Sequence, residues 1–312
     1  WYRRGIYIGI AVFCVGTTAL NCILYRKAAG ISSQQYYAEI KRVENVDVID
    51  EQYRFNNNDN LVTMTVPLAG TGSWCSTVGR GIFEFYESLG LERTIASLEG
   101  PEGTVELLGG RYTIYNERQE NGQLVSVVGS DEGNVYIYEN EDVLPIGFSQ
   151  DVYMLKSDFL KLDPELRALA MIKALVIEDD MESEVERVLR KYDPEIDGII
   201  SSENKIKDIR EHLQEKGENF SRSGKGFSVT MIADREKYAF FSVPMDDGWT
   251  AEVNGESAEI LDINGMMAIQ IHEGENKIEV KYEVPFLREG VIISIIGIAV
   301  WGTYYAVTRR KK

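Results

Sequence analysis

The chain has 312 residues, of which 44% are hydrophobic, and it carries a formal net charge of −17. This length and composition fit a globular protein of about two domains with a sizeable core, and they exclude a largely disordered chain. Because the first residue is Trp1 rather than Met, we expect a fragment of a longer protein.

The charges are unevenly placed along the chain. Residues 1–27 and 288–312 hold nine of the 33 basic residues and a single acidic one, Glu289, which leaves 24 basic and 49 acidic residues between them. Such an acidic surface repels nucleic acid, so we expect no nucleic-acid partner. We interpret it as a solvated surface; the alternative is a region that works among cations or cationic polymers.

Residues 5–25 form an uncharged run of 21 residues, long enough for a transmembrane helix. The alternative is a signal peptide, since Arg3 and Arg4 precede the run. However, the run is longer than a usual signal-peptide core, and Arg26–Lys27 stand where a cleavage region would lie. A transmembrane helix is therefore the favoured interpretation.

Residues 290–307 are a second uncharged run, of 18 residues. Arg309–Lys312 follow it, which argues against the alternative of a buried core helix and places the carboxyl end in the cytoplasm. We therefore expect a protein of the cell membrane, in contact with the lipid bilayer, with both ends cytoplasmic and residues 28–287 extracytoplasmic.

Residues 31–225 are expected to form an α+β domain. Residues 33–48 predict a strand, or a short helix passing into a strand. Residues 81–90 have apolar residues at helical spacing and end at Gly90, a natural helix terminus. Alternating strands are predicted at 104–116, 123–130 and 134–140.

Helical signals dominate from residue 157. Asp163 and Pro164 are typical of a helix start, and helices are predicted over 157–179, 181–193 and 202–217.

Residues 226–284 read as short alternating strands joined by turns such as Asn254–Gly255 and Asn264–Gly265. This pattern predicts a compact antiparallel β-sandwich. The expected fold is an α+β extracytoplasmic region with a C-terminal antiparallel β-sandwich, flanked by two transmembrane helices.

The sequence offers little for catalysis or metal binding. Cys75 with the two histidines, His212 and His272, is imaginable as a thiol site, but a buried cysteine is the simpler interpretation. The small-residue loop 70–81 lacks the order of a phosphate-binding loop, and 56–60 has cation-ligand residue types without a calcium-loop frame. We therefore predict no catalytic residue, no metal site and no cofactor on this chain.

Two tryptophans are candidates for contact with a sugar. Trp74 lies in the small-residue loop, and Trp249 follows Asp246 and Asp247. Sugars stack on exposed aromatic faces while nearby polar groups bind their hydroxyls. The alternative is that each tryptophan fills a core. Strand alternation places Trp249 on an apolar face and favours the core there; for Trp74 both interpretations stay open.

Several blocks together resemble the C-terminal portion of the bacterial YfhO-type membrane proteins, which are grouped with the GT-C glycosyltransferases. "VYIYENEDVLPIGF" (135–148), "LLGGRYTIY" (107–115) and "STVGRGIFEFYESLGL" (76–91) are similar to family blocks, and residues 246–285 resemble the family's ending. The order of the blocks extends over nearly all of 31–312. Asn254 stands where Asp is frequent, and "EVPFLREG" has one proline where two are common.

The resemblance implies a parent protein that moves sugar from a polyprenyl-phosphate donor to a cell-envelope acceptor such as teichoic acid. The family's catalytic acids lie on loops between earlier spans, so none is carried over to this chain. An accessory role is expected, with a cell-envelope glycopolymer or lipid-linked sugar as partner. The alternative is a two-span surface binding or scaffold protein without enzymatic role.

Overall fold

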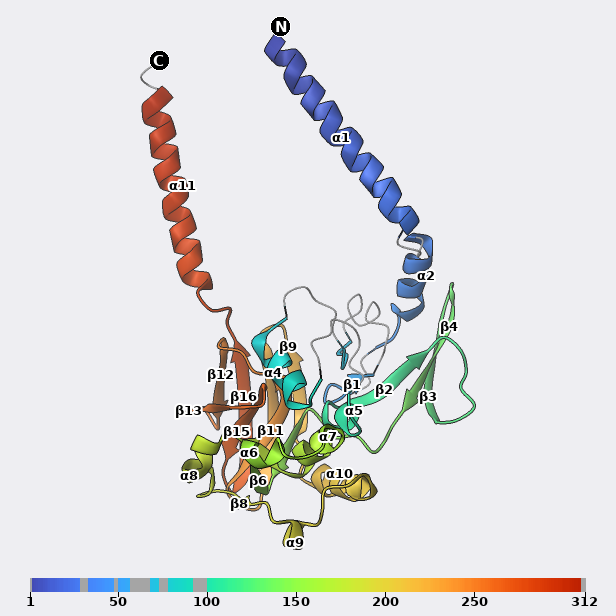
Figure 1. Ribbon diagram of the computed structural model, residues 1–312, viewed down its shortest axis with the longest axis vertical. Helices are drawn as coiled ribbons and strands as arrows, with labels where there is room; N and C mark the ends of the chain where they lie inside the picture. Colours follow the sequence, from blue (N-terminus) through green and yellow to red (C-terminus); the bar gives the residue numbers. More distant parts are fainter. Residues whose placement is uncertain are drawn as a thin grey trace.

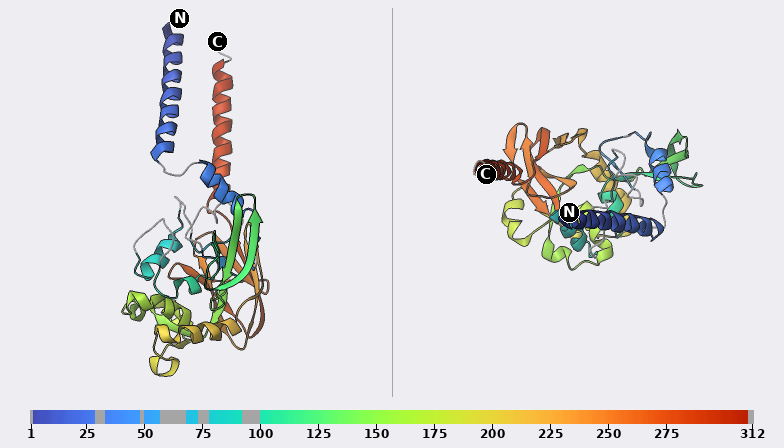
Figure 2. Two further views of the ribbon diagram at one scale, coloured as in Figure 1. Left: turned by 90° about the vertical axis from the view of Figure 1, so that its right-hand side faces the viewer. Right: turned by 90° about the horizontal axis from the view of Figure 1, so that it is seen from above.

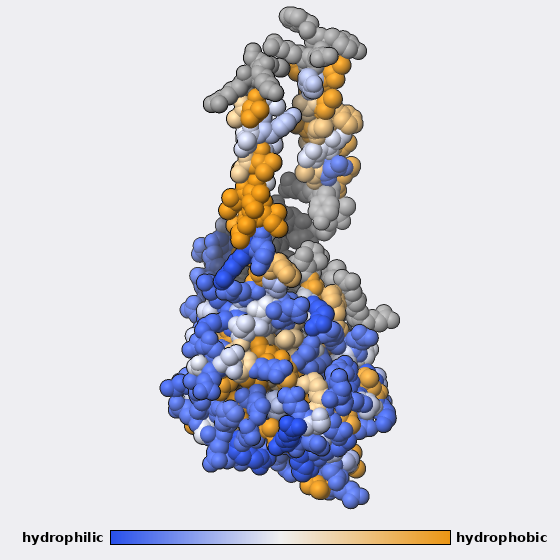
Figure 3. Space-filling model, turned by 90° about the vertical axis from the view of Figure 1, so that its left-hand side faces the viewer, coloured by the Kyte–Doolittle hydropathy of each residue, from blue (hydrophilic) through white to orange (hydrophobic). Residues whose placement is uncertain are grey.

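Two long helices leave the folded body from the same end. The structure, a computed structural model, describes residues 2–28, 33–47, 50–56, 68–72, 78–91 and 100–309. The helices are α1 (Tyr2–Ala28) and α11 (Leu287–Arg309) (Figure 1, Figure 2). Both are exposed, and both are long and apolar enough to cross a membrane. Figure 3 shows their apolar side chains above a mostly polar body.

The N-terminal part of the body is a short helix beside a four-stranded sheet. Residues 33–48 begin with a helix, α2 (Ser33–Val43), as the second predicted option has it, but residues 44–47 form no strand. The sheet has the order β1-β2-β4-β3, with β1 parallel to β2 and the other pairs antiparallel. Its strands are β1 (Arg54–Phe55), β2 (Gly110–Tyr115), β3 (Gln123–Ser130) and β4 (Gly133–Glu139).

Short helices form the middle of the chain around a small parallel sheet of order β7-β6-β8. The predicted helix at 81–90 is confirmed as α4 (Arg80–Ser88), and Gly90 follows it with φ of 75°. The strands are β6 (Val152–Leu155), β7 (Leu175–Ile177) and β8 (Arg190–Lys191). The remaining helices are α5 (Thr104–Leu107), α6 (Lys156–Phe159), α7 (Pro164–Lys173), η1 (Asp179–Met181), α8 (Glu182–Val185), α9 (Pro194–Asp197), η2 (Ser202–Asn204) and α10 (Lys205–Gln214).

Three local predictions in this part are wrong. Residues 104–107 form a helical turn, which the Thr104 hydroxyl fixes by donating to the Pro101 carbonyl at 2.7 Å. The predicted helix 157–179 breaks, and Leu175–Ile177 pairs with β6 because all three side chains are buried and two are β-branched. Within 181–193 only Glu182–Val185 is α-helical, since Arg190–Lys191 pairs with β6.

Two antiparallel sheets form the C-terminal part of the body. The five-stranded sheet has the order β13-β12-β16-β10-β9, and the four-stranded sheet has the order β14-β15-β11-β5. The strands are β5 (Gly147–Gln150), β9 (Glu218–Ser223), β10 (Gly226–Ala233), β11 (Lys237–Pro244), β12 (Trp249–Val253), β13 (Glu256–Ala258), β14 (Ile260–Ile263), β15 (Met266–Ile271) and β16 (Gly274–Tyr282).

The two sheets share one apolar cluster. Phe227 and Ile278 of the five-stranded sheet are buried in it with Phe241 and Ile269 of the four-stranded sheet. The expected mixed α+β chain, with C-terminal antiparallel sheets between two apolar helices, is thus confirmed. Strands β5 and β9 precede residue 226 and pair with β11 and β10, so the sheets draw strands from both sides of the boundary predicted there. That boundary stays a prediction.

Asparagine–glycine turns set the registers of two hairpins. Asn254 and Gly255 have φ of 54° and 84°, and Asn264 and Gly265 have φ of 51° and 80°. Two successive positive φ values are what a tight turn between twisted antiparallel strands requires. The turns predicted from these dipeptides are confirmed.

One end of the five-stranded sheet leads directly into α11. The strand β16 ends at Tyr282, and α11 begins at Leu287. In the adjacent strand Trp249 pairs with Tyr282, and on the other side Gly226 pairs with Lys281. We refer to this end, which holds Gly226, Trp249 and Tyr282, as the α11-proximal end.

Candidate functional site

Trp249 begins β12 at the α11-proximal end and is partly buried. Its indole Nε1–H donates to the Pro244 carbonyl at 3.1 Å. Its ring meets the rings of Tyr282 and Phe227 edge-on, with centroids 4.9 Å and 6.5 Å away. Trp249 packs against the shared apolar cluster and also lines a cavity. Trp249 is thus partly a core residue and partly exposed to a cavity where a ligand could lie. Contact with a sugar stays a prediction.

The two aspartates before Trp249 have different surroundings. Asp246 Oδ1 accepts a hydrogen bond from the Tyr282 hydroxyl and another from the Gly248 backbone N–H, both at 3.1 Å. Burial and the hydrogen bond of its hydroxyl to Asp246 raise the pKa of Tyr282, which keeps the phenol neutral. Asp247 is exposed. Asp246 thus positions an aromatic ring of the cavity, whereas Asp247 faces solvent.

The third candidate, Trp74, lies in 73–77, outside the described residues, and so does Cys75. The histidines named with Cys75 have separate partners. The ring of His212 packs on Phe148 with centroids 5.2 Å apart, and His272 Nδ1 lies 3.2 Å from Glu236 Oε1. Most of the segment 56–60 is also outside the described ranges. Among the residues that the structure does describe, no group of three or more His, Cys, Asp or Glu is placed to hold a metal ion.

The cavity beside Trp249 has a volume of about 380 Å³, within the usual range for small-molecule sites. Four aromatic and three basic residues dominate its lining. We call it the aromatic–arginine pocket and define it by Phe220, Phe227, Trp249, Tyr282, Arg54, Arg222 and Lys225. Strands β1, β9, β10, β12 and β16 and the β9–β10 turn supply these residues.

Arg54 is held in place by neutral oxygen atoms. Its Nη1 donates to the Leu108 carbonyl at 2.5 Å and to the Ser242 hydroxyl at 2.8 Å, and its Nη2 donates to the Ser242 carbonyl at 2.7 Å. Burial and the positive charge of Arg222 lower the pKa of Arg54 to about 10. The guanidinium therefore stays charged at neutral pH, in a place where that charge is unfavourable.

Arg222 lies at the same pocket with an unsatisfied donor. Its Nε atom is buried and has no hydrogen-bond partner within the described part of the chain. Its backbone N–H donates to Glu51 Oε2 at 2.7 Å. Over the described ranges, no carboxylate oxygen lies within 4.0 Å of a side-chain nitrogen of Arg54, Arg222 or Lys225. The pocket thus gathers positive charge in a strongly acidic chain.

The β9–β10 turn that carries Lys225 depends on a glycine. Gly226 has φ of 147°, and a Cβ there would lie 1.9 Å from the Val280 carbonyl oxygen. The Lys225 carbonyl accepts from the Tyr282 backbone N–H at 2.7 Å. The close approach of β10 to β16 therefore fixes the turn against the pocket.

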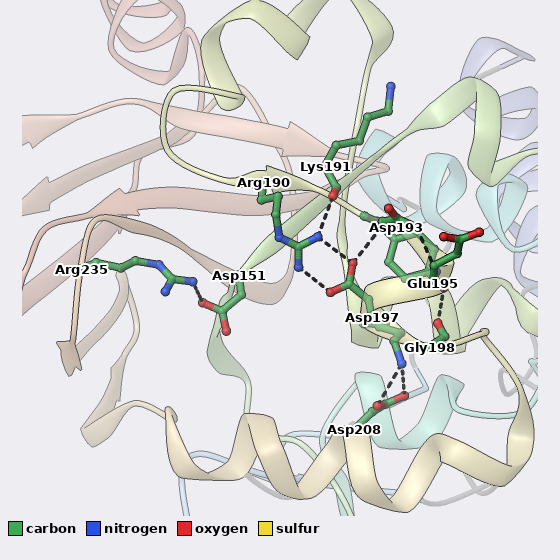
Figure 4. A network of polar contacts seen from close by, with 11 residues as sticks. Asp151, Arg190, Lys191, Asp193, Glu195, Asp197, Gly198, Asp208 and Arg235 are labelled. Atoms are coloured by element: carbon green, nitrogen blue, oxygen red, sulfur yellow. Dashed lines mark hydrogen bonds and ion pairs between the residues drawn. The ribbon is translucent and has the colours of Figure 1, made fainter.

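A second polar cavity, of about 600 Å³, lies near α9 and α10 (Figure 4). Asp197 accepts from Arg190 Nη2 at 2.5 Å and from the Asp193 backbone N–H at 2.8 Å. Lys173 pairs with Asp208 at 3.2 Å, and Arg235 pairs with Asp151 at 2.6 Å. Because these charges are mutually paired, we interpret this network as structural.

A family model for the bacterial membrane protein YfhO matches residues 7–221 and 199–294. The chain belongs to this family. Membership in a membrane-protein family, together with the two apolar helices, supports a location in a membrane. The comparisons with curated proteins and with solved structures found no match.

Sequence reasoning identified Trp249 and missed the basic residues of the pocket. Arg54 and Arg222 are 168 positions apart; Arg54 stands between two aromatic residues and Arg222 between two serines, so no local motif links them. The available signal was "RSGKG" (222–226), two basic residues around a tight turn in an acidic region. It points to a turn, and only the fold shows what the turn faces.

The pocket has groups suited to binding an anion and a ring. Guanidinium groups donate planar pairs of hydrogen bonds to phosphate or carboxylate. Aromatic rings supply flat surfaces for sugars or other apolar groups. The described residues that line the pocket include no Asp, Glu or His, so they supply no side chain that would act as a general base at neutral pH.

Proposed function

We propose that this chain is the extracytoplasmic region, with two flanking spans, of a YfhO-type protein that transfers sugar from a polyprenyl-phosphate donor to a cell-envelope acceptor such as teichoic acid. In this proposal the region positions the acceptor or the lipid-linked sugar and contributes no catalytic residue. The main support is the place of the aromatic–arginine pocket, since Tyr282 of that pocket is five positions before α11 begins at Leu287.

The proposal needs the folded body to lie outside the cytoplasm. The basic residues after α11, Arg309–Lys312, favour a cytoplasmic carboxyl end. Because α1 and α11 leave the body from the same end (Figure 2), two spans would place the body on the opposite side of the bilayer. Protease added to intact cells should then digest 28–287. Complete protection of the body in intact cells, with digestion only after lysis, would contradict this orientation.

A surface binding or scaffold protein without enzymatic role is the second candidate. The observation in its favour is that the described lining of the pocket contains no carboxylate or imidazole side chain. The two functions predict different effects of deleting the gene on the sugar content of envelope polymers.

The test is the sugar content of purified envelope polymers from cells with and without the gene. The proposed function predicts loss of one sugar substituent on deletion and its return when the complete gene is supplied. Unchanged sugar content in the deletion strain would contradict the transfer role and favour the binding role.

A further inference from the structure

We infer that the aromatic–arginine pocket binds the phosphate group of an amphiphile in the adjacent membrane leaflet. Arg222 and Arg54 would face the phosphate, while Trp249 and Tyr282 contact the polar group attached to it. The inference deepens the proposed function and rests on its placement of the pocket beside the membrane.

The first support is two guanidinium groups that form no ion pair within the described part of the chain, the nearest carboxylate contact being that of Glu51 with the Arg222 backbone N–H at 2.7 Å. The positive charge of Arg222 makes the charge of Arg54 less favourable. The side-chain contacts of Arg54 are with the neutral oxygens of Leu108 and Ser242. Buried charges in proteins are normally paired, and an unpaired one is costly. A bound anion would supply the missing negative charge.

The second support is a hydrogen-bond donor, unpartnered within the described ranges, on a residue that lines the pocket. Arg222 Nε is buried and unpartnered among the described residues, although such atoms usually find a hydrogen-bond partner. Phosphate oxygens accept strong, charge-assisted hydrogen bonds from guanidinium groups. Lys225, in the turn fixed by Gly226, adds a third cation at the rim. This arrangement fits phosphate better than a neutral sugar alone.

The third support is the aromatic wall. Trp249 and Tyr282 are held by hydrogen bonds from the Trp249 indole to Pro244 and from the Tyr282 phenol to Asp246. Ordered rings need little reorganisation when a ligand binds. A pocket of about 380 Å³ has room for more than a phosphate ion, so we expect a phosphate with an attached glycosyl or glyceryl group.

The fourth support is the apolar connection to the bilayer. Between Tyr282 and the body of α11 lie Val284, Phe286 and Leu287, which are 54%, 82% and 57% exposed. Exposed apolar residues of this kind at the base of a membrane helix suit the lipid interface. Clustered basic residues beside a membrane surface attract anionic head groups. The ligand is therefore expected to arrive on a lipid rather than from free solution.

The test uses the full chain, purified in neutral detergent, and equilibrium binding of three probes. These are a short-chain phosphatidylglycerol, a neutral glycolipid with the same acyl chains, and inorganic phosphate. We expect binding of the phosphatidylglycerol at least about tenfold tighter than that of either other probe, and weaker binding at high salt. Equal binding of the neutral glycolipid, or tight binding of inorganic phosphate alone, would overturn the inference.

The variant Arg222→Gln removes the charge and should weaken binding of the phosphatidylglycerol about tenfold or more, while Arg222→Lys should lose less. The matched control is Arg187→Gln, an exposed arginine just after α8 that makes the same change in net charge. Thermal unfolding shows whether each variant is folded. Unchanged affinity in folded Arg222→Gln protein would overturn the pocket assignment. The proposed function would survive an unchanged affinity of Arg222→Gln if deletion of the gene still removes an envelope sugar.

Discussion

At the residue scale, the most buried charged side chain among the described residues lies between three carboxylates. Lys237 is 1% exposed, and its Nζ lies 2.7 Å from Glu215, 2.8 Å from Asp234 and 3.0 Å from Asp151. These partners come from three segments of the chain, so the ion pairs tie the C-terminal sheets to α10. Arg54 differs from Lys237 because its side-chain contacts are with neutral oxygens only. This difference supports a binding role for Arg54.

Replacing Lys237 with Met should destabilise the body by about 3 kcal/mol, because three carboxylates lose their common partner. Chemical denaturation measures this loss. The control is Lys277→Met, since Lys277 is 71% exposed and its pair with Glu275 is 3.4 Å long; its effect should stay below about 0.5 kcal/mol. Equal effects of both variants would contradict the assigned role of Lys237.

His212 should make stability depend on pH near neutrality. Burial lowers its pKa below the usual 6.5, although Asp151, Asp208 and Glu215 act in the opposite direction. The folded chain thus binds fewer protons here than the unfolded chain. The free energy of unfolding should fall as pH drops from about 7 to about 5, and the fall should be shallower in His212→Gln. Identical pH profiles of the two proteins would refute this assignment.

The glycine of the β9–β10 turn offers a sharp pair of substitutions. Gly226→Ala should cost about 2 kcal/mol or more, because φ is 147° and the added Cβ meets Val280 O at 1.9 Å. Gly224→Ala, two positions earlier, has open space and should change stability by less than about 0.5 kcal/mol. Thermal unfolding distinguishes them, and a harmless Gly226→Ala would mean that the turn has another conformation.

At the element scale, the features that can be read from the sequence are those set by neighbouring residues. The uncharged runs determine α1 and α11, and Asn254–Gly255 and Asn264–Gly265 determine their turns. Where long-range pairing decides, the sequence misleads. Leu175–Ile177 continues a helical pattern in the sequence but pairs with β6 in the structure. Because all three of its side chains are buried, the segment lacks the apolar–polar alternation that would indicate a strand.

The start of α7 is a local feature with a measurable contribution. Asp163 Oδ1 accepts from the Glu165 backbone N–H at 3.2 Å, with Pro164 in the first turn. Asp163→Ala should cost about 1 kcal/mol, and Asp163→Asn, which keeps an accepting oxygen, should cost less. Equal losses measured by denaturation would mean that the side chain does not cap the helix.

At the scale of the whole molecule, the fold brings together a site that no stretch of sequence contains. Trp249 could be predicted to lie on an apolar strand face, because alternation is local. Arg54 and Arg222 come from β1 and β9, and their meeting depends on how the N-terminal sheet packs beside the C-terminal sheets. The same packing places the pocket at the sheet end that leads into α11, which is the basis of the proposed role at a membrane.

The most direct measurement compares envelope polymers from cells that express the complete protein as wild type, Arg222→Gln or Arg187→Gln at equal levels. If the pocket positions a phosphate-bearing lipid for sugar transfer, Arg222→Gln should lower the polymer's sugar content toward that of the gene deletion. Arg187→Gln should keep the wild-type content. Wild-type sugar content in cells with folded, membrane-inserted Arg222→Gln protein would contradict the account.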